Sequence, residues 1–281
     1  MSDIQVLKSN GTLESFDEQK LIRSLQKSQA SEEEILSAVA FVKENLKPNI
    51  PTSDLYALAY KTLNTQKKHN PHAIRYALKR SVMNLGPTGF PFERFIARIF
   101  EEMGYICDIG VTISGKCIDH EVDIFAHKDK EVICIEAKFH NEPHLKSDTK
   151  VALYVKARFD DLLNQKVTVN NNEYVVNKAI LITNTTFTDT AHNYVTCVGT
   201  FELLSWSRPK EKNLLSYIEE LNLYPVTVVP ELTKKEIEFL VEQNILTCSD
   251  LKKNPNILDQ VNIKPNRKKS IIETLSQVCN C

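Results

Sequence analysis

The sequence predicts a multidomain protein of the α/β class, with an α+β arrangement of three compact units. Residues 1–85 contain two short strands followed by helical patterns, and residues 86–208 mix helical and strand patterns. Residues 209–281 contain short helical patterns separated by prolines. At 281 residues the chain is also longer than one average domain, which agrees with a division at these points.

The first unit is predicted to be a β-hairpin followed by four helices. Residues 4–8 and 13–16 have the composition of short strands, and residues 9–12 form the turn between them. Asp17 is a suitable N-cap for the first helix, and Ser31 begins the second with a capping-box pattern. The third helix follows Pro51 and the fourth begins near Pro71, because proline is favoured in the first helical turn.

The second unit begins with a helical pattern and continues mainly as strands. Residues 92–105 have apolar side chains at helical spacing and a glycine stop at Gly104. The strand patterns cover residues 120–125, 131–139, 177–184 and 203–206, with a hairpin over residues 165–174. An amphipathic helix is predicted for residues 146–163.

Asp123, Glu136 and Lys138 form the most informative group of polar residues. Because side chains alternate across a strand, Glu136 and Lys138 project to one face and Ala137 to the other. Asp123 reaches the same face if its strand pairs with theirs through a turn at residues 129–130. Mg²⁺ usually takes one or two protein carboxylates, and a lysine beside them can orient water or stabilise phosphate charge. The group therefore suggests metal-assisted phosphodiester hydrolysis, although spacing alone equally allows a solvated strand face.

At this point residues 86–208 resemble the Mrr-like restriction endonucleases of the PD-(D/E)xK superfamily. The resemblance rests on the early helix with Glu93, on Asp123 and residues 136–138, on the late strand with Asn184 and Phe187, and on the closing strand at residues 203–206. It implies an αβββαβ restriction-endonuclease-like core. It also implies that Asp123, Glu136 and Lys138 are catalytic, with Glu93 as an accessory acid that helps the other two acids hold Mg²⁺ or Mn²⁺. This branch often has Gln where the chain has Glu136, and Glu is the better cation ligand.

Residues 1–85 resemble the ATP-cone, a nucleotide-sensing module. The matching elements are residues 6–8, 10–11, 16–17, 20–22, Thr52 and residues 75–77. The resemblance implies that ATP or dATP binds to a set of basic and turn residues: Lys8, Asn10, Gly11, Lys20, Arg23 and Arg75. Turn amides around Gly11 can approach a phosphate closely, and lysines can neutralise it. Ser9 stands where the family often has a second basic residue, and an interaction domain with solvated lysines is the alternative.

The third unit is predicted to be small and helical. It loosely resembles tandem helix-hairpin-helix domains, with a late hairpin at residues 263–269. Such hairpins usually present glycine amides to phosphate, yet no glycine follows Gly199. A packing or oligomerisation domain therefore remains an equal interpretation.

Basic and histidine side chains near the predicted site have two interpretations each. The predicted helix at residues 146–163 carries Lys146, Lys150, Lys156 and Arg158, which either meet the DNA backbone or form a solvated helix face. His120 and His140 either touch the scissile phosphate or belong to a polar rim.

Composition is that of an ordinary soluble protein, with 42% hydrophobic and 25% charged residues. The net charge of −1 provides no global attraction to DNA, so any nucleic-acid surface must be local. The seven cysteines indicate reduced thiols. Without a signal peptide or a long apolar span, the sequence predicts a cytoplasmic protein that does not associate with a membrane.

These interpretations together predict a Mg²⁺-dependent DNA endonuclease of the restriction or defence type, regulated by ATP or dATP bound to the first unit. Double-stranded DNA is the expected substrate. A homodimer or larger homo-oligomer is expected because two opposite strands require two active sites. The alternative is a nucleotide-controlled DNA-binding regulator whose nuclease-like core does not cut.

Overall fold

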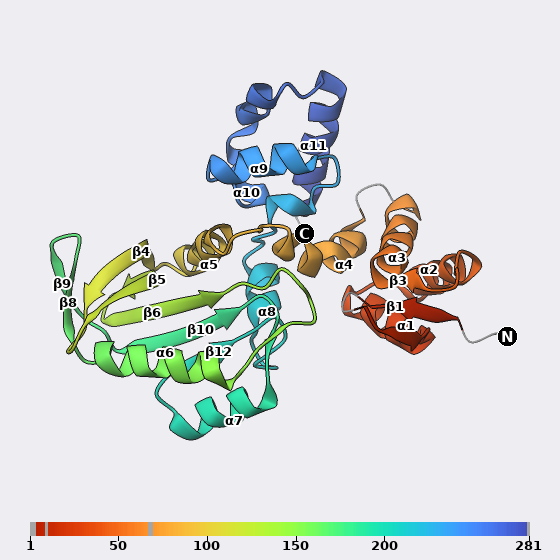
Figure 1. The fold of residues 1–281 in the computed structure, drawn as a ribbon. Helices are drawn as coiled ribbons and strands as arrows, with labels where there is room; N and C mark the ends of the chain where they lie inside the picture. The colour runs from red at the N-terminus through yellow and green to blue at the C-terminus, as the bar shows by residue number, and fades with distance from the viewer. Residues whose placement is uncertain (1–3, 9–10, 67–69, 280–281) are drawn as a thin grey trace.

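The N-terminal unit is a small sheet covered by helices. The computed structural model describes residues 4–8, 11–66 and 70–279 (Figure 1). Strand β1 (Gln5–Leu7) pairs antiparallel with β2 (Leu13–Ser15) and parallel with β3 (Ile50–Pro51). The accompanying helices are α1 (Glu18–Lys27), α2 (Glu32–Glu44), α3 (Thr52–Gln66) and α4 (Pro71–Met83). The hairpin and helices agree with the prediction, whereas β3 is too short to produce a detectable period.

The predicted helix starts are confirmed by their hydrogen bonds. The side chain of Asp17 accepts a hydrogen bond from the Lys20 backbone N–H at 3.1 Å. Ser31 and Glu34 exchange hydrogen bonds in a capping box at the start of α2. These contacts satisfy backbone donors that the first helical turn leaves without partners.

The second unit is a five-stranded sheet with helices on both faces. Its strand order is β12-β10-β6-β5-β4. The strands are β4 (Ile106–Ser114), β5 (Asp119–Lys128), β6 (Glu131–Lys138), β10 (Lys178–Thr183) and β12 (Glu202–Leu204). Helix α5 (Phe90–Glu102) covers one face, and α6 (Thr149–Leu162) with α7 (Asp189–Val198) covers the other. This arrangement contains the predicted αβββαβ core (Figure 1).

Two short ribbons supplement the main sheet. Strand β7 (Lys146–Ser147) pairs with β11 (Thr186–Phe187), and β8 (Lys166–Val169) forms a hairpin with β9 (Asn172–Val175). The β8–β9 hairpin confirms the hairpin predicted for residues 165–174. Lys146 therefore belongs to a strand rather than to the predicted helix, which begins after the N-cap Asp148.

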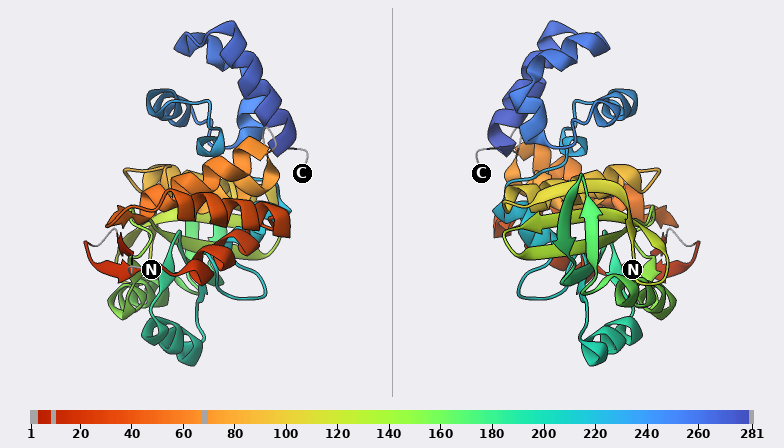
Figure 2. Two further views of the ribbon diagram at one scale, coloured as in Figure 1. Left: turned by 90° about the vertical axis from the view of Figure 1, so that its right-hand side faces the viewer. Right: turned by 90° about the vertical axis from the view of Figure 1, so that its left-hand side faces the viewer.

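The C-terminal unit is helical; its first helix lies beside the sheet, and residues 234–278 project from one end of the molecule (Figures 1 and 2). Its elements are α8 (Leu214–Glu220), η1 (Val226–Val228), α9 (Lys234–Glu242), α10 (Cys248–Lys253), η2 (Pro255–Val261) and α11 (Pro265–Val278). The predicted late hairpin at residues 263–269 is wrong in extent. Only residues 262–264 lie between η2 and α11, because Pro265 starts a helix with its fixed φ angle.

Helix α4 joins the N-terminal unit to the rest of the molecule. Its buried residues Ile74, Leu78 and Val82 belong to the same apolar core as α5, the sheet and the C-terminal helices. The Thr227 hydroxyl of η1 donates to the Ser81 backbone oxygen of α4 at 2.6 Å. A change in the position of α4 would therefore alter the packing of both other units.

A helix that crosses a lipid bilayer needs about 20 consecutive, mainly apolar residues. Within residues 4–8, 11–66 and 70–279, every helix is too short or too polar to span a membrane.

Candidate active site

Strands β5 and β6 separate at the position of the predicted acidic residues. Their backbone ladder runs from the pair Lys128↔Glu131 to the pair Ile124↔Ile135. At the next position, an oxygen of the Asp123 carboxylate accepts a hydrogen bond of 2.7 Å from the Ala137 backbone N–H. Beyond this point β6 continues beside β10. We call this point of separation the fork: Asp123 lies on the β5 side, Glu136 lies on the β6 side, and the Asp123 side chain bridges the two strands.

The other neighbour of β5 is also irregular at this position. Gly110 of β4 lies between the pairs Ile109↔Ile124 and Val111↔Val122, opposite Asp123. Its φ angle of 64° lies in the left-handed region that favours glycine. Asp123 therefore lies where β5 is least constrained by regular pairing.

Glu136 and Lys138 lie on one face of β6, as predicted from the strand period. Ala137 points to the opposite face, where it is 8% exposed and packs in the apolar core beside α5. The Glu136 side chain is 22% exposed. Lys138 is exposed at the end of the strand. A partly buried acid and an accessible lysine are thus held side by side at the fork.

The acidic residues at the fork repel one another. Burial raises the pKa of Glu136 to about 7, and the nearby Asp123 carboxylate adds to the increase. Burial likewise raises the pKa of Glu93 to about 7, with a further contribution from Asp123. Burial also raises the pKa of Asp123, against the hydrogen bond from Ala137. The fork therefore has an excess of negative charge that a cation would relieve.

Glu93 reaches this group from the first turn of α5. Gly89 precedes it by one turn, and a Cβ atom at Gly89 would lie 3.3 Å from a Glu93 carboxylate oxygen. A glycine at position 89 thus leaves room for the Glu93 side chain. Since α5 and β6 belong to different layers, the fold brings Glu93 to acids that are 30 and more residues away in sequence.

The carboxylates at the fork fit a single small divalent cation better than a metal centre that needs three or more protein ligands. Within the described ranges, no three His, Cys, Asp or Glu side chains already converge as a metal-binding group. Mg²⁺ retains several of its waters and needs only one or two protein carboxylates, so Asp123 and Glu136 would suffice. Oxygen donors alone also suit a hard cation rather than zinc.

Two residues at the fork were missed by the sequence prediction of the site. Arg158 of α6 donates a hydrogen bond of 2.7 Å to Glu136. The charge of Glu121 contributes to the raised pKa values of Asp123 and Glu93. Glu121 stands two residues before Asp123, so the strand period could have indicated it. Arg158 carried only a general expectation of DNA contact, because its approach to Glu136 depends on how α6 packs on the sheet.

The histidines near the site are held by other side chains. His120 lies 2.9 Å from Asp161, and His140 lies 2.9 Å from the Ser147 hydroxyl. Asn184 fixes the chain after β6, since its side chain bonds both the N–H and the C=O of His140. The polar-rim interpretation suits His140, whereas His120 is buried beside Asp161.

The other basic side chains of the α6 region differ from Arg158. Lys156 forms an ion pair with Asp160 on its own helix. Lys146 and Lys150 are exposed. Of this predicted group, Arg158 is the member that contacts Glu136, and the remaining lysines face solvent or a neighbouring acid.

The N-terminal unit contains a pocket of about 230 Å³ beside the β1–β2 hairpin. Lys8 and Lys20 both line it, together with Glu14. Lys8 lies 3.0 Å from a Glu14 oxygen, and Lys20 forms an ion pair with the same carboxylate. Tyr56 and Tyr76 form an aromatic wall, with ring centroids 4.8 Å apart. Two predicted lysines therefore converge on a pocket that also has stacking surfaces.

The remaining predicted nucleotide residues are distributed differently. Asn10 lies outside the described residues. Gly11 lies in the hairpin turn with a φ angle of 81°, and its N–H donates to the Lys8 carbonyl at 3.0 Å. Arg23 is largely exposed and 3.9 Å from Asp17. Arg75 lies away from the pocket lining, where it donates to Gln29 at 2.8 Å and pairs with Glu219 of α8.

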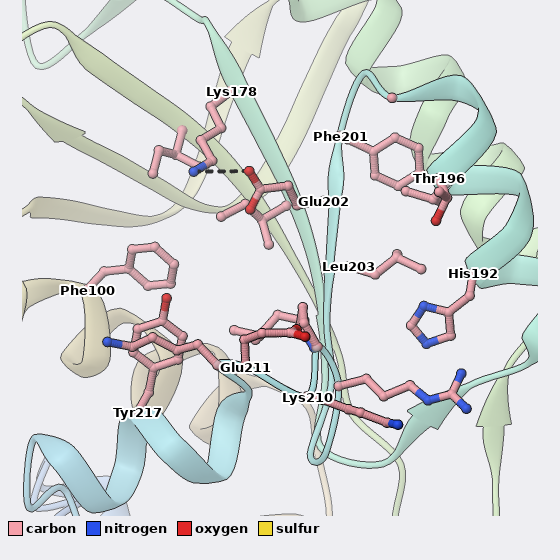
Figure 3. A pocket seen from close by; sticks show the side chains of 18 of the residues that line it. Phe100, Lys178, His192, Thr196, Phe201, Glu202, Leu203, Lys210, Glu211 and Tyr217 are labelled. Carbon is pink, nitrogen blue, oxygen red and sulfur yellow. Dashed lines mark ion pairs between the residues drawn. The ribbon is translucent and has the colours of Figure 1, made fainter.

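A further cavity of about 610 Å³ surrounds the edge strand β12 (Figure 3). Phe100, Tyr217 and the ion pair of Lys178 with Glu202 lie on one side of the strand, and His192 lies on the other. None of the predicted catalytic or nucleotide residues that the structure describes lines this cavity. Its size therefore does not bear on the chemistry expected at the fork.

Three family models match successive parts of the chain. The model described as "ATP cone domain" matches residues 4–83, and the Mrr catalytic model, described as "Restriction endonuclease", matches residues 87–208. The model described as "AF1548-like, C-terminal" matches residues 224–279. The two resemblances inferred from the sequence thus agree with independent family matches.

Individual relatives were also found. An "Uncharacterized protein" of Archaeoglobus fulgidus is 33% identical over 156 residues, covering 56% of this chain and 83% of the relative. The "Crystal Structure of Protein of Unknown Function AF1548" is 27% identical with a TM-score of 0.54, covering 69% of this chain and 99% of the other. The "MspJI Restriction Endonuclease in Complex with 27-mer Oligonucleotide" covers 70% of this chain and 45% of the other. At 14% identity and a TM-score of 0.32, that likeness carries no argument.

The matches and the fold agree on the class of protein. The restriction-endonuclease model covers the sheet that contains the fork, and the ATP-cone model covers the hairpin and helices around the lysine pocket. The chain therefore contains an Mrr-like restriction-endonuclease domain, of the PD-(D/E)xK superfamily, and an N-terminal ATP cone.

Proposed function

We propose that this protein is a Mg²⁺-dependent DNA endonuclease of the restriction or defence type. The observation that carries the proposal is the fork between β5 and β6, where Asp123 and Glu136 lie with Lys138 beside them. The burial of Glu136 and Glu93, which raises the pKa of each to about 7, supports it, because a bound cation would stabilise the ionised carboxylates.

Each residue at the fork has a distinct role in the proposed reaction. Asp123 and Glu136 would hold Mg²⁺ or Mn²⁺, and Glu93 would help to retain it. When bound, the metal ion lowers the pKa of a water and offsets charge on the phosphodiester. Lys138 orients the attacking water or stabilises the developing phosphate charge. The Ala137 N–H fixes the Asp123 carboxylate, so one ligand is oriented before the substrate arrives.

The proposed regulation acts through the N-terminal pocket. ATP or dATP places its triphosphate at Lys8 and Lys20, in place of Glu14, and its base against the tyrosines. Tyr76 of α4 lines this pocket, while Leu78 of the same helix is buried in the core shared with the nuclease sheet. In the proposed division at residues 1–85, 86–208 and 209–281, α4 thus provides a mechanical connection between nucleotide and active site.

Cleavage of both DNA strands would require two copies of the site. We therefore propose a homodimer or larger homo-oligomer that acts on double-stranded DNA in the cytoplasm. Sedimentation of the full chain with and without dATP would measure whether nucleotide changes the assembly. An exclusively monomeric protein that cuts both strands would contradict this part of the proposal.

The experiment that tests the activity is plasmid cleavage in Mg²⁺ by the wild type, Asp123→Ala and Lys138→Ala. The proposal predicts that the wild type cuts and that both variants lose nearly all activity. If the wild type is no better than the variants on any nucleic acid, the enzymatic proposal fails.

One observation favours a second function, that of a nucleotide-controlled DNA-binding regulator with a core that does not cut. Arg158 forms an ion pair with the proposed metal ligand Glu136, as expected of a core that has replaced its metal by an arginine. DNA binding that depends on nucleotide, without cleavage under any metal condition, would favour this function over nuclease activity.

A further inference from the structure

Arg158 is attached to the candidate active site by more than one contact. Its guanidinium donates to a Glu136 oxygen at 2.7 Å and to the Glu121 backbone oxygen. The group also lies over the ring of Tyr154, 5.6 Å from its centroid. The Arg158 side chain is 16% exposed, so it lies near the surface and remains accessible. It is therefore a positive charge held at the fork by the packing of α6.

The ion pair with Glu136 opposes the binding of a divalent cation by the same carboxylate. Two positive groups at one acid repel each other, and the acid loses part of its ligand strength to the hydrogen bond. A metal ion that binds Asp123 and Glu136 would therefore weaken the hold of Glu136 on Arg158.

A released guanidinium would remain close to the reacting phosphate. Helix α6 fixes the Cα atom of Arg158, and Tyr154 lies one turn earlier on the same helix, where it supports the side chain. A guanidinium group is planar and can donate hydrogen bonds to two oxygens of one phosphate. Lys156 of the same helix instead pairs with Asp160.

We propose that Arg158 is a phosphate ligand of the active site, retained by Glu136 in the free protein and transferred to a phosphodiester oxygen when metal ion and DNA bind. This inference rests on the proposed nuclease function. No bond is made or broken in the transfer, and its direction follows from the two ion pairs that compete. A purely structural clamp is the opposing interpretation, in which Arg158 holds Glu136 ready for the metal.

The test uses the full chain with Ca²⁺, a cation chosen to measure binding without relying on cleavage. Calorimetry compares the wild type with Arg158→Ala, Asp123→Ala and the control Lys156→Ala, which removes a cation from the same helix. Loss of the competing charge should tighten Ca²⁺ binding by Arg158→Ala about tenfold, which corresponds to roughly one pK unit of interaction. Lys156→Ala should bind Ca²⁺ as the wild type does. A structural clamp predicts weaker Ca²⁺ binding by Arg158→Ala.

The second measurement is fluorescence anisotropy of a DNA duplex with the same proteins in Ca²⁺. Arg158→Ala should bind DNA about tenfold more weakly, and the slope of log K against log salt should fall by about one unit. Arg158→Lys should recover part of the DNA affinity, because it restores the positive charge but cannot bind two phosphate oxygens as guanidinium does. Circular dichroism checks that each variant is folded.

The two proposals fail in different ways. If Ca²⁺ binding by the wild type is absent, or equals that of Asp123→Ala, the proposed metal site and the role of Arg158 are both rejected. If the wild type binds Ca²⁺ through Asp123 but Arg158→Ala binds it no more tightly, or binds DNA as well as the wild type, only the role of Arg158 is rejected.

Discussion

Replacement of Glu136 by Gln should make the metal-free protein more stable at pH 8 and change its stability much less near pH 5. The pKa of Glu136 is about 7 in the folded protein, against an ordinary value of 4.5. A raised acid pKa means that folding favours the protonated form. The free energy of unfolding therefore falls as pH rises from about 4.5 to about 7, and the full loss is present above pH 7.

The size of the effect follows from the difference between the two pKa values. A shift of about 2.5 units at about 1.36 kcal/mol each gives an upper limit of about 3 kcal/mol for the partly buried Glu136. Gln has the shape of the protonated acid and cannot ionise. At roughly 2 °C per kcal/mol for a chain of this size, Glu136→Gln should raise the Tm by about 6 °C at pH 8.

The assay is thermal unfolding of wild type and Glu136→Gln in EDTA at pH 5, 6, 7 and 8. The difference in Tm between the two proteins should grow with pH and level off above pH 7. Added Mg²⁺ should reduce the difference at pH 8, because the cation stabilises the ionised carboxylate of the wild type. A pH-independent difference, or a variant that is less stable at pH 8, would refute the electrostatic reasoning.

Three further changes test the N-terminal unit and its connection to the sheet. The double substitution Lys8→Ala and Lys20→Ala should weaken ATP or dATP binding at least tenfold in calorimetry, because charge-assisted hydrogen bonds contribute about 1.5–3 kcal/mol each. Unchanged binding would indicate that the unit contacts proteins rather than nucleotide. Leu78→Ala removes a fully buried side chain of α4 and should lower the free energy of unfolding by about 2–5 kcal/mol, measured as a lower Tm. Hydrogen exchange should become faster in both α4 and the C-terminal helices. Faster exchange in the N-terminal unit alone would contradict the shared core. Thr227→Val removes the hydrogen bond to α4 and should lower the free energy of unfolding by about 1 kcal/mol. It should also reduce the effect of dATP on DNA cleavage. An unchanged response to dATP would show that this contact does not transmit nucleotide binding to the active site.

The strand period predicted the local geometry of the candidate site. Residues 129–130 form the turn between β5 and β6, and Asp129 adopts a φ angle of 52°, a conformation that Asp tolerates better than most residues. Glu136 and Lys138 share a face, and Ala137 is buried on the other. These features depend on neighbours in sequence, so a sequence pattern can indicate them.

Long-range contacts were beyond the same patterns. Arg158 is 22 residues from Glu136, and their ion pair depends on the rotation of α6 over the sheet. Arg75 was assigned to nucleotide by resemblance, yet it lies beside Glu219 at the junction with α8. The apolar face of α4 was visible as a helical pattern, but a pattern of apolar spacing does not specify which partner covers it. For this reason the connection between the units emerged only from the structure.

The central claim is tested most directly by cleavage of supercoiled plasmid in Mg²⁺ by the wild type and by Asp123→Asn, which keeps the size of the side chain but removes its charge. The account predicts nicked and linear DNA from the wild type and complete loss of cutting in EDTA. It also predicts at least about a hundredfold slower cutting by the variant, the order seen when one group that stabilises transition-state charge is removed. Equal cutting by both proteins, or cutting by the wild type that persists in EDTA, would contradict the account.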